Sequence, residues 1–104
     1  MSQFDVHPNP VGRSKGYPLV VQLQSDLVDL GNREVIIAPL VPAAMLGSKD
    51  SVLLPTVRHA GADYRIAVPM LRSIQQRRLG SPIGEVRDSR WAILTAVDRL
   101  FTGG

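Results

Sequence analysis

The residue types that most often catalyse reactions or bind metals are few in this sequence and do not cluster. His7 and His59 are its only histidines, they lie in separate segments, and the chain contains no cysteine. A structural zinc site needs four ligands and a catalytic one at least three. We therefore expect no metal site and no cofactor, and we expect both histidines to have structural roles.

Two further segments have a superficial likeness to catalytic or phosphate-binding motifs. Asp26, Asp29 and Glu34 surround a predicted turn, where paired carboxylates could perform acid–base chemistry. Turns favour Asp for backbone reasons, so a turn is the preferred interpretation. The segment GSKDS, residues 47–51, lacks the G-x-x-x-x-G-K spacing that binds phosphate. We predict no catalytic residues, and we expect a protein that acts by binding rather than an enzyme.

Arginine is concentrated in the C-terminal third of the chain. The densest basic stretch contains Arg72, Arg77, Arg78, Arg87 and Arg90, and the formal net charge is +3 with a pI near 10. An RNA-binding face would have this composition, but the chain has only five aromatic residues on which bases could stack. We expect a solvated basic face that favours acidic partners, without sequence-specific binding of nucleic acid.

Length and composition indicate one domain over residues 1–104. The chain is 44% hydrophobic and 20% charged, which is typical of a globular protein with its own core. The N-terminal MSQFDVHPNP has neither the basic nor the apolar region of a signal peptide. No apolar run approaches the roughly 18 residues that a membrane-spanning helix needs. We expect a cytoplasmic protein without membrane contact.

Eight prolines and nine glycines divide the chain into short segments, which favours a small β-structure. Strands are predicted at residues 3–6, 19–24 and 33–40, and the last of these is expected to end at Pro39. A short helical turn is expected between Pro42 and Gly47. The clearest hairpin joins residues 56–59 to residues 64–68 through the loop AGAD. Residues 72–78 fit either a short strand or a loop.

A helix is predicted at the C-terminal end, with Asp88 or Ser89 as its N-cap. Trp91, Leu94, Val97 and Phe101 follow the spacing of one helical face, joined by Ile93 and Leu100. This face is expected to be buried, with Trp91 in the core. The predicted architecture is therefore several antiparallel strands followed by one helix that packs on the sheet.

The order of these segments resembles the CcdB family of toxins from bacterial toxin–antitoxin systems. The matching stretches are QFDV, LVVQLQSDLVD, REVIIAPL, LLPTVRHAGADYRI and the closing helix through RLF. They cover nearly the whole chain in order, apart from the loop at residues 7–16. The resemblance implies a mainly β protein with one C-terminal helix. Its fold would be an SH3-like barrel of the CcdB/MazF type, an antiparallel sheet with a small second sheet, and it would form a homodimer.

The resemblance also implies a function and a set of contact residues. Members of the family are not enzymes; they bind the A subunit of DNA gyrase and trap it with cleaved DNA, and a CcdA-like antitoxin neutralises them. The acidic antitoxin segment would suit the basic character of this chain. Carried over by position, the gyrase-binding residues are Gln3, Phe4, His7, Ser25, Leu27, Val28, Asp98, Phe101, Thr102, Gly103 and Gly104.

The C-terminal tripeptide departs from the family pattern. Members that poison gyrase end in Trp-Gly-Ile, whereas this chain ends in Thr102-Gly103-Gly104, and Asp98 stands where the family has an amide. A tryptophan buried at the centre of an interface is commonly worth about 2 kcal/mol, or roughly 30-fold in affinity.

Three interpretations follow. The chain is a gyrase poison with altered contacts, or a CcdB-fold homologue that dimerises and binds antitoxin but does not poison gyrase. The third is an endoribonuclease like MazF, which needs an Arg with a Ser or Thr on the dimer face. The first is preferred, because the rest of the contact set stays apolar or similar in size.

Overall fold

The computed structural model describes residues 2–10, 17–24, 33–47 and 51–103. Its strands are β1 (Asp5–Pro8), β2 (Leu19–Gln22), β3 (Glu34–Pro42), β4 (Thr56–His59), β5 (Ala62–Ile66), β6 (Arg72–Gln75) and β7 (Gly84–Glu85). One α-helix, α1 (Arg90–Thr102), and short 3₁₀ turns complete the described elements. No helix in these residues has both the length and the apolar character to cross a membrane.

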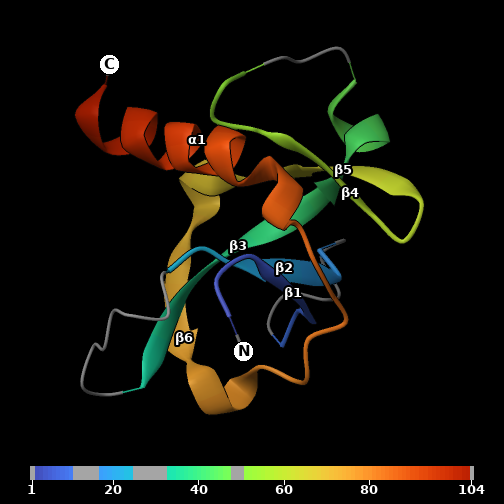
Figure 1. Ribbon diagram of the computed structural model, residues 1–104, viewed down its shortest axis with the longest axis vertical. Coiled ribbons are helices and arrows are strands. Elements are labelled where there is room, and N and C mark those ends of the chain that lie inside the picture. Colours follow the sequence, from blue (N-terminus) through green and yellow to red (C-terminus); the bar gives the residue numbers. More distant parts are fainter. Residues whose placement is uncertain (1, 11–16, 25–32, 48–50, 104) are drawn as a thin grey trace.

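The strands form one antiparallel sheet in the order β4-β5-β3-β2-β1-β7, which curls into a nearly closed barrel. The long strand β3 makes this closure possible, because β6 pairs with its first half, Glu34–Ile37, and β5 pairs with its end, Leu40–Pro42. The helix α1 runs across one end of the barrel (Figure 1). The predicted fold class, mainly β with a C-terminal helix, is confirmed. The β4–β5 hairpin stands apart from the strands around β1, but remains joined to them through β3.

The strand predicted to end at Pro39 continues to Pro42, so this boundary was wrong. Proline lacks an N–H and is tolerated where the ladder needs no donor. Pro39 lies between the part of β3 that pairs with β6 and the part that pairs with β5. Its carbonyl still accepts a hydrogen bond from the Ala67 N–H at 2.9 Å. Because β3 changes partner from β6 to β5 at this point, the missing N–H of Pro39 does not end the strand.

The N-terminal strand begins at Asp5 rather than Gln3, because the backbone at Phe4 is left-handed. Phe4 has φ 69° and its side chain is buried. Its N–H donates to the Gln22 carbonyl at 2.7 Å, and its own carbonyl accepts from the Val86 N–H at 2.9 Å. Both backbone groups are thus satisfied outside a regular ladder. Strand β2 likewise ends at Gln22, two residues earlier than predicted.

The turn chemistry of the middle of the chain is confirmed. The hairpin consists of β4 and β5, but β5 (Ala62–Ile66) both begins and ends two residues before the predicted strand, so these bounds were wrong. Its two-residue turn has φ 51° at Ala60 and 79° at Gly61, the left-handed pair that matches the twist of a hairpin. The predicted helical turn is a 3₁₀ segment at Ala43–Leu46 between Pro42 and Gly47. The ambiguous segment after residue 71 is β6 followed by a 3₁₀ turn, η4 (Gln76–Arg78).

The helix α1 exists as predicted, but a different face is buried. Ile93 and Ala96 are fully buried, and Val97 and Leu100 pack against the same core. Trp91 and Phe101 are each 71% exposed and Leu94 is 40% exposed, so their predicted burial was wrong. Ser89 is the N-cap residue but its side chain makes no capping hydrogen bond. The sheet therefore selects a stripe through residues 93, 96, 97 and 100, and leaves Trp91 outside it.

Candidate partner-binding surface

The C-terminal end of α1 is capped by hydrogen bonds from Thr102 and Gly103. Gly103 adopts the left-handed conformation (φ 70°) that commonly ends helices, and its N–H donates to the Arg99 carbonyl at 3.0 Å. The Thr102 hydroxyl donates to the Asp98 carbonyl at 2.8 Å. The last turn is thus satisfied internally. Phe101 lies in this turn with 71% of its surface exposed.

An apolar groove of about 240 Å³ lies beside this helix end. It is lined by Leu23, Gln24, Ile36, Leu71, Leu94, Val97 and Phe101. The one polar side chain among them, Gln24, turns its Oε1 to the Ile36 N–H at 3.2 Å and so presents little polarity to the groove. Leu94 is 40% exposed at the rim. A groove of this composition, with an exposed phenylalanine on its edge, is suited to receive an apolar part of another protein.

Of the residues expected to bind gyrase, Phe101 lines this groove. Asp98, Phe101, Thr102 and Gly103 are exposed on the last turn of α1 and just beyond it. Gln3 is half-buried, and its Nε2 donates to the carbonyl of Leu23, a groove residue, at 3.0 Å. The positions of Ser25, Leu27, Val28 and Gly104 lie outside the described residues.

The other two expected contact residues have buried side chains. Phe4 is 4% exposed and belongs to the core cluster on which α1 packs. His7 is fully buried, and its Nδ1 lies 2.9 Å from the Gly80 carbonyl. In this conformation neither side chain presents a surface to a partner. Their effect on binding would come from how they support β1 and the helix.

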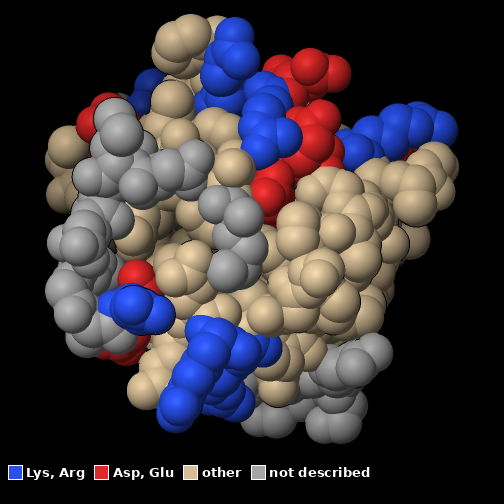
Figure 2. Space-filling view, turned by 60° about the horizontal axis from the view of Figure 1, so that its bottom comes forward, with Lys and Arg blue, Asp and Glu red and all other residues tan. Residues whose placement is uncertain are grey.

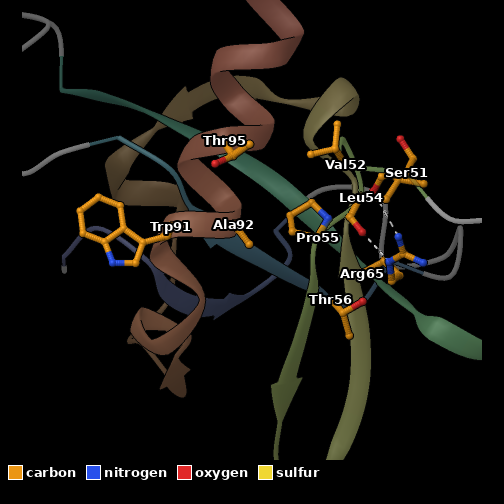
Figure 3. A pocket seen from close by; sticks show the side chains of 9 residues that line it. All are labelled: Ser51, Val52, Leu54, Pro55, Thr56, Arg65, Trp91, Ala92 and Thr95. Atoms are coloured by element: carbon orange, nitrogen blue, oxygen red, sulfur yellow. Dashed lines mark hydrogen bonds between the residues drawn. The ribbon is translucent and has the colours of Figure 1, made fainter. Parts of the chain in front are cut away.

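A second cavity, of about 330 Å³, lies at the opposite end of α1 (Figure 3). It is lined by Ser51, Val52, Leu54, Pro55, Thr56, Arg65, Trp91, Ala92 and Thr95. Here Arg65 pairs across the hairpin with Thr56, the two residue types that a ribonuclease like MazF would need. The Arg65 guanidinium, however, donates to the Leu54 carbonyl through Nε and to the Ser51 carbonyl through Nη2, the latter at 3.3 Å. These bonds hold the segment before β4, which is a structural role.

The basic stretch seen in the sequence is divided between two places. Arg87 lies among carboxylates, 2.8 Å from Asp5 and 3.5 Å from Glu85, and Arg90 lies over the Trp91 ring at 5.6 Å. Arg72, Arg77 and Arg78 lie on β6 and η4 instead. On the face drawn in Figure 2, acidic side chains accompany the basic ones at the top of the view, and another basic group lies at the bottom. The arginines therefore do not form one continuous face.

Sequence reasoning missed most of the residues that line the groove. Leu23, Ile36 and Leu71 read as ordinary strand or loop hydrophobics, and Leu94 was expected in the core. One signal was present: Leu94 and Phe101 are seven residues apart, which places them on one side of a helix. Across the described residues, no group of three His, Asp or Glu side chains is placed to hold a metal ion.

Comparison with protein families agrees with this fold. The family model described as CcdB protein matches residues 3–103, nearly the whole chain. The match includes β1, the barrel strands and all of α1, the elements that build the groove and the helix end. The chain therefore belongs to the CcdB family, whose members are toxins of toxin–antitoxin systems.

Proposed function

We propose that this toxin binds the A subunit of DNA gyrase with the C-terminal end of α1 and traps the cleaved gyrase–DNA complex in the cytoplasm. The observation that carries the proposal is Phe101, an aromatic side chain that is 71% exposed at the tip of the helix beside an apolar groove. Family membership supplies the target. The chain acts as an inhibitor that binds a protein, not as an enzyme.

Among the described residues, the proposed gyrase contacts are limited to those that are accessible. Asp98, Phe101, Thr102 and Gly103 form the helix tip, and Gln3 lies near the groove. Ser25, Leu27, Val28 and Gly104 complete the proposed set by their family positions. Phe4 and His7 support the surface from the interior.

A homodimer and an acidic, CcdA-like antitoxin are the further partners. An exposed apolar groove and the sheet edges at β4 and β7 favour a second copy, which would cover apolar surface and unpaired backbone groups. The net charge of +3 favours an acidic antitoxin.

A gyrase cleavage assay tests the proposal directly. Purified protein, plasmid DNA, ATP and gyrase from the matched host should accumulate linear DNA only when all four are present. Phe101→Ala should remove this activity. Trp91→Ala is the matched control, because Trp91 is also 71% exposed on α1 but lies at its other end. No linear DNA from a folded protein that still binds its antitoxin would favour the alternative, a family member that does not poison gyrase.

The C-terminal tripeptide provides a second test, in the direction of a gain. Thr102→Trp combined with Gly104→Ile restores the ending of family members that poison gyrase, and should raise gyrase affinity about 30-fold, since a central aromatic anchor is worth about 2 kcal/mol. Isothermal calorimetry with the gyrase A subunit measures the change. Unchanged affinity would argue against gyrase binding at this helix end.

A further inference from the structure

Four arginines lie on β6, on η4 and directly before β3, well separated in the sequence from the helix tip. We call Arg33, Arg72, Arg77 and Arg78 the arginine edge; all four are exposed. The Gln76 N–H donates to the Arg33 carbonyl at 2.8 Å, which brings Arg33 beside η4 although more than forty residues separate them in the sequence. Arg72 lies at the other end of β6, three residues or about 10 Å from Gln75.

These guanidinium groups lack carboxylate partners among the described residues. The ion pairs there join Arg58 to Asp63 and Arg87 to Asp5 and Glu85. Arg77 donates only its Nε, to the Oε1 of Gln75 at 3.1 Å. The acidic residue nearest in the sequence, Glu34, accepts a hydrogen bond from the Ser73 hydroxyl at 3.3 Å.

The surroundings of the arginine edge define the chemistry of its partner. The exposed neighbours on β6 are polar, Ser73 and Gln75, while Ile74 and Leu79 are buried. Within β6 and η4 the edge therefore offers no exposed apolar side chain as an anchor for a peptide, which a protein partner usually requires. Nor does β6 or η4 carry an aromatic side chain on which a base could stack.

Guanidinium groups without aromatic or apolar neighbours are suited to phosphate oxygens. We propose that the arginine edge binds the phosphate backbone of duplex DNA, without reading its sequence. The 10 Å from Arg72 to η4, together with the length of the arginine side chains, lets the edge reach about three neighbouring phosphates of the duplex. The choice of DNA rests on the proposed function, which brings the protein to DNA held by gyrase. Contact with DNA would increase the affinity that the helix tip provides for the gyrase–DNA complex.

The salt dependence of DNA binding is the first readout, and it requires no gyrase. Fluorescence anisotropy with a labelled 20-bp duplex of arbitrary sequence measures the association constant between 50 and 200 mM NaCl. Three phosphate contacts predict a log–log slope of about −2.7, which is an affinity loss of about 40-fold over that range. A second duplex of unrelated sequence should bind equally well. Absence of binding at 50 mM salt would overturn the proposal.

Two double variants separate the arginine edge from net charge alone. Arg77→Gln with Arg78→Gln should weaken binding at least tenfold at 50 mM salt and flatten the slope by about 1.8. Arg58→Gln with Arg90→Gln removes the same charge elsewhere on the surface and should change affinity less than threefold. Equal losses in both variants would show that only net charge acts. Thermal melts show whether each variant is folded, which is expected because all four side chains are exposed.

A competition experiment tests the nature of the partner. Unlabelled duplex should displace the probe at far lower concentration than polyglutamate of the same charge. Equal competition by polyglutamate would identify an acidic peptide as the ligand and overturn the DNA proposal. Because gyrase is absent throughout, failure here leaves the gyrase proposal standing, and failure of the cleavage assay leaves this result intact.

Discussion

At the scale of single residues, Asp5 is the most buried of the carboxylates that form ion pairs in the described part of the chain. Its side chain is 9% exposed, its Oδ2 accepts from the Ser2 N–H at 2.8 Å, and its Oδ1 lies 2.8 Å from the Arg87 Nη2. The pair joins β1 to the turn before α1. We expect Asp5→Asn to lower the free energy of unfolding by about 1–3 kcal/mol, because it removes a charged acceptor and leaves Arg87 without this partner. Urea denaturation measures it.

The exposed pair between Arg58 and Asp63 is the matched control. Its side chains are 70% and 58% exposed and its closest atoms are 3.4 Å apart. Asp63→Asn should change the free energy of unfolding by less than about 1 kcal/mol, since water screens such pairs. If the two Asn variants lose equal stability, burial is not what strengthens the Asp5 contact.

At the scale of elements, the β4–β5 turn is close to the ideal hairpin sequence but retains one strained residue. Ala60 has φ 51°, and an alanine there costs about 1–2 kcal/mol. Asparagine tolerates this conformation, and Asn-Gly is the preferred pair for such a turn. Ala60→Asn should therefore raise the free energy of unfolding by about 0.5–1 kcal/mol. Thermal and urea denaturation at fixed protein concentration measure it.

Substitution of the neighbouring glycine, Gly61, is expected to lower the free energy of unfolding instead. A Cβ at Gly61 meets no atom within 4 Å, so Gly61→Ala reports only the cost of its φ of 79°. That variant should lose about 1–2 kcal/mol. If Ala60→Asn destabilises the protein while Gly61→Ala is neutral, the turn does not have the left-handed geometry at both positions.

The elements also show which structural features can be predicted from a sequence. The hairpin, the turn at Ala43–Leu46 and the existence of α1 follow from local rules: turn residues, capping glycines and helical spacing. The continuation of β3 through Pro39 depends on two partner strands that are distant in the sequence. The buried face of α1 is likewise chosen by the sheet, which is why Trp91 was misplaced.

The candidate site was legible only in part. The helix tip at Phe101 was expected from the family resemblance, and its exposure is consistent with a contact role. The burial of Phe4 could not be read from sequence, because alternation along a strand does not reveal a left-handed residue at its start. His7 is buried because β1 is covered on both faces, so that Asp5, Val6 and His7 are all buried. The groove joins the segment after β2, the strand β3, the residue before β6 and the helix α1, so only the folded chain brings it together.

At the scale of the whole molecule, the two ends of α1 differ in what they expose, and this difference tests the dimer. The groove at the C-terminal end is almost wholly apolar, whereas the cavity at the N-terminal end contains Arg65 and three hydroxyl side chains. Apolar surface left in water favours self-association, and a twofold axis lets one patch cover its own copy. We therefore expect the 11.3 kDa chain to sediment as a dimer at micromolar concentration, with the Leu94 rim of the groove in the interface and Phe101 at the helix tip left outside it.

Two charge substitutions locate that interface. Leu94→Glu places a carboxylate on the rim of the groove and should shift the sedimentation equilibrium towards monomer by at least tenfold, because the charge would lose water on dimerisation. Trp91→Glu introduces the same charge at the other end of α1, on a side chain that is also exposed, and should leave the dimer intact. If Trp91→Glu dissociates the dimer and Leu94→Glu does not, the interface lies at the N-terminal end of the helix. A wild-type monomer would remove the dimer from the proposal while leaving the helix tip free to bind gyrase as a single copy.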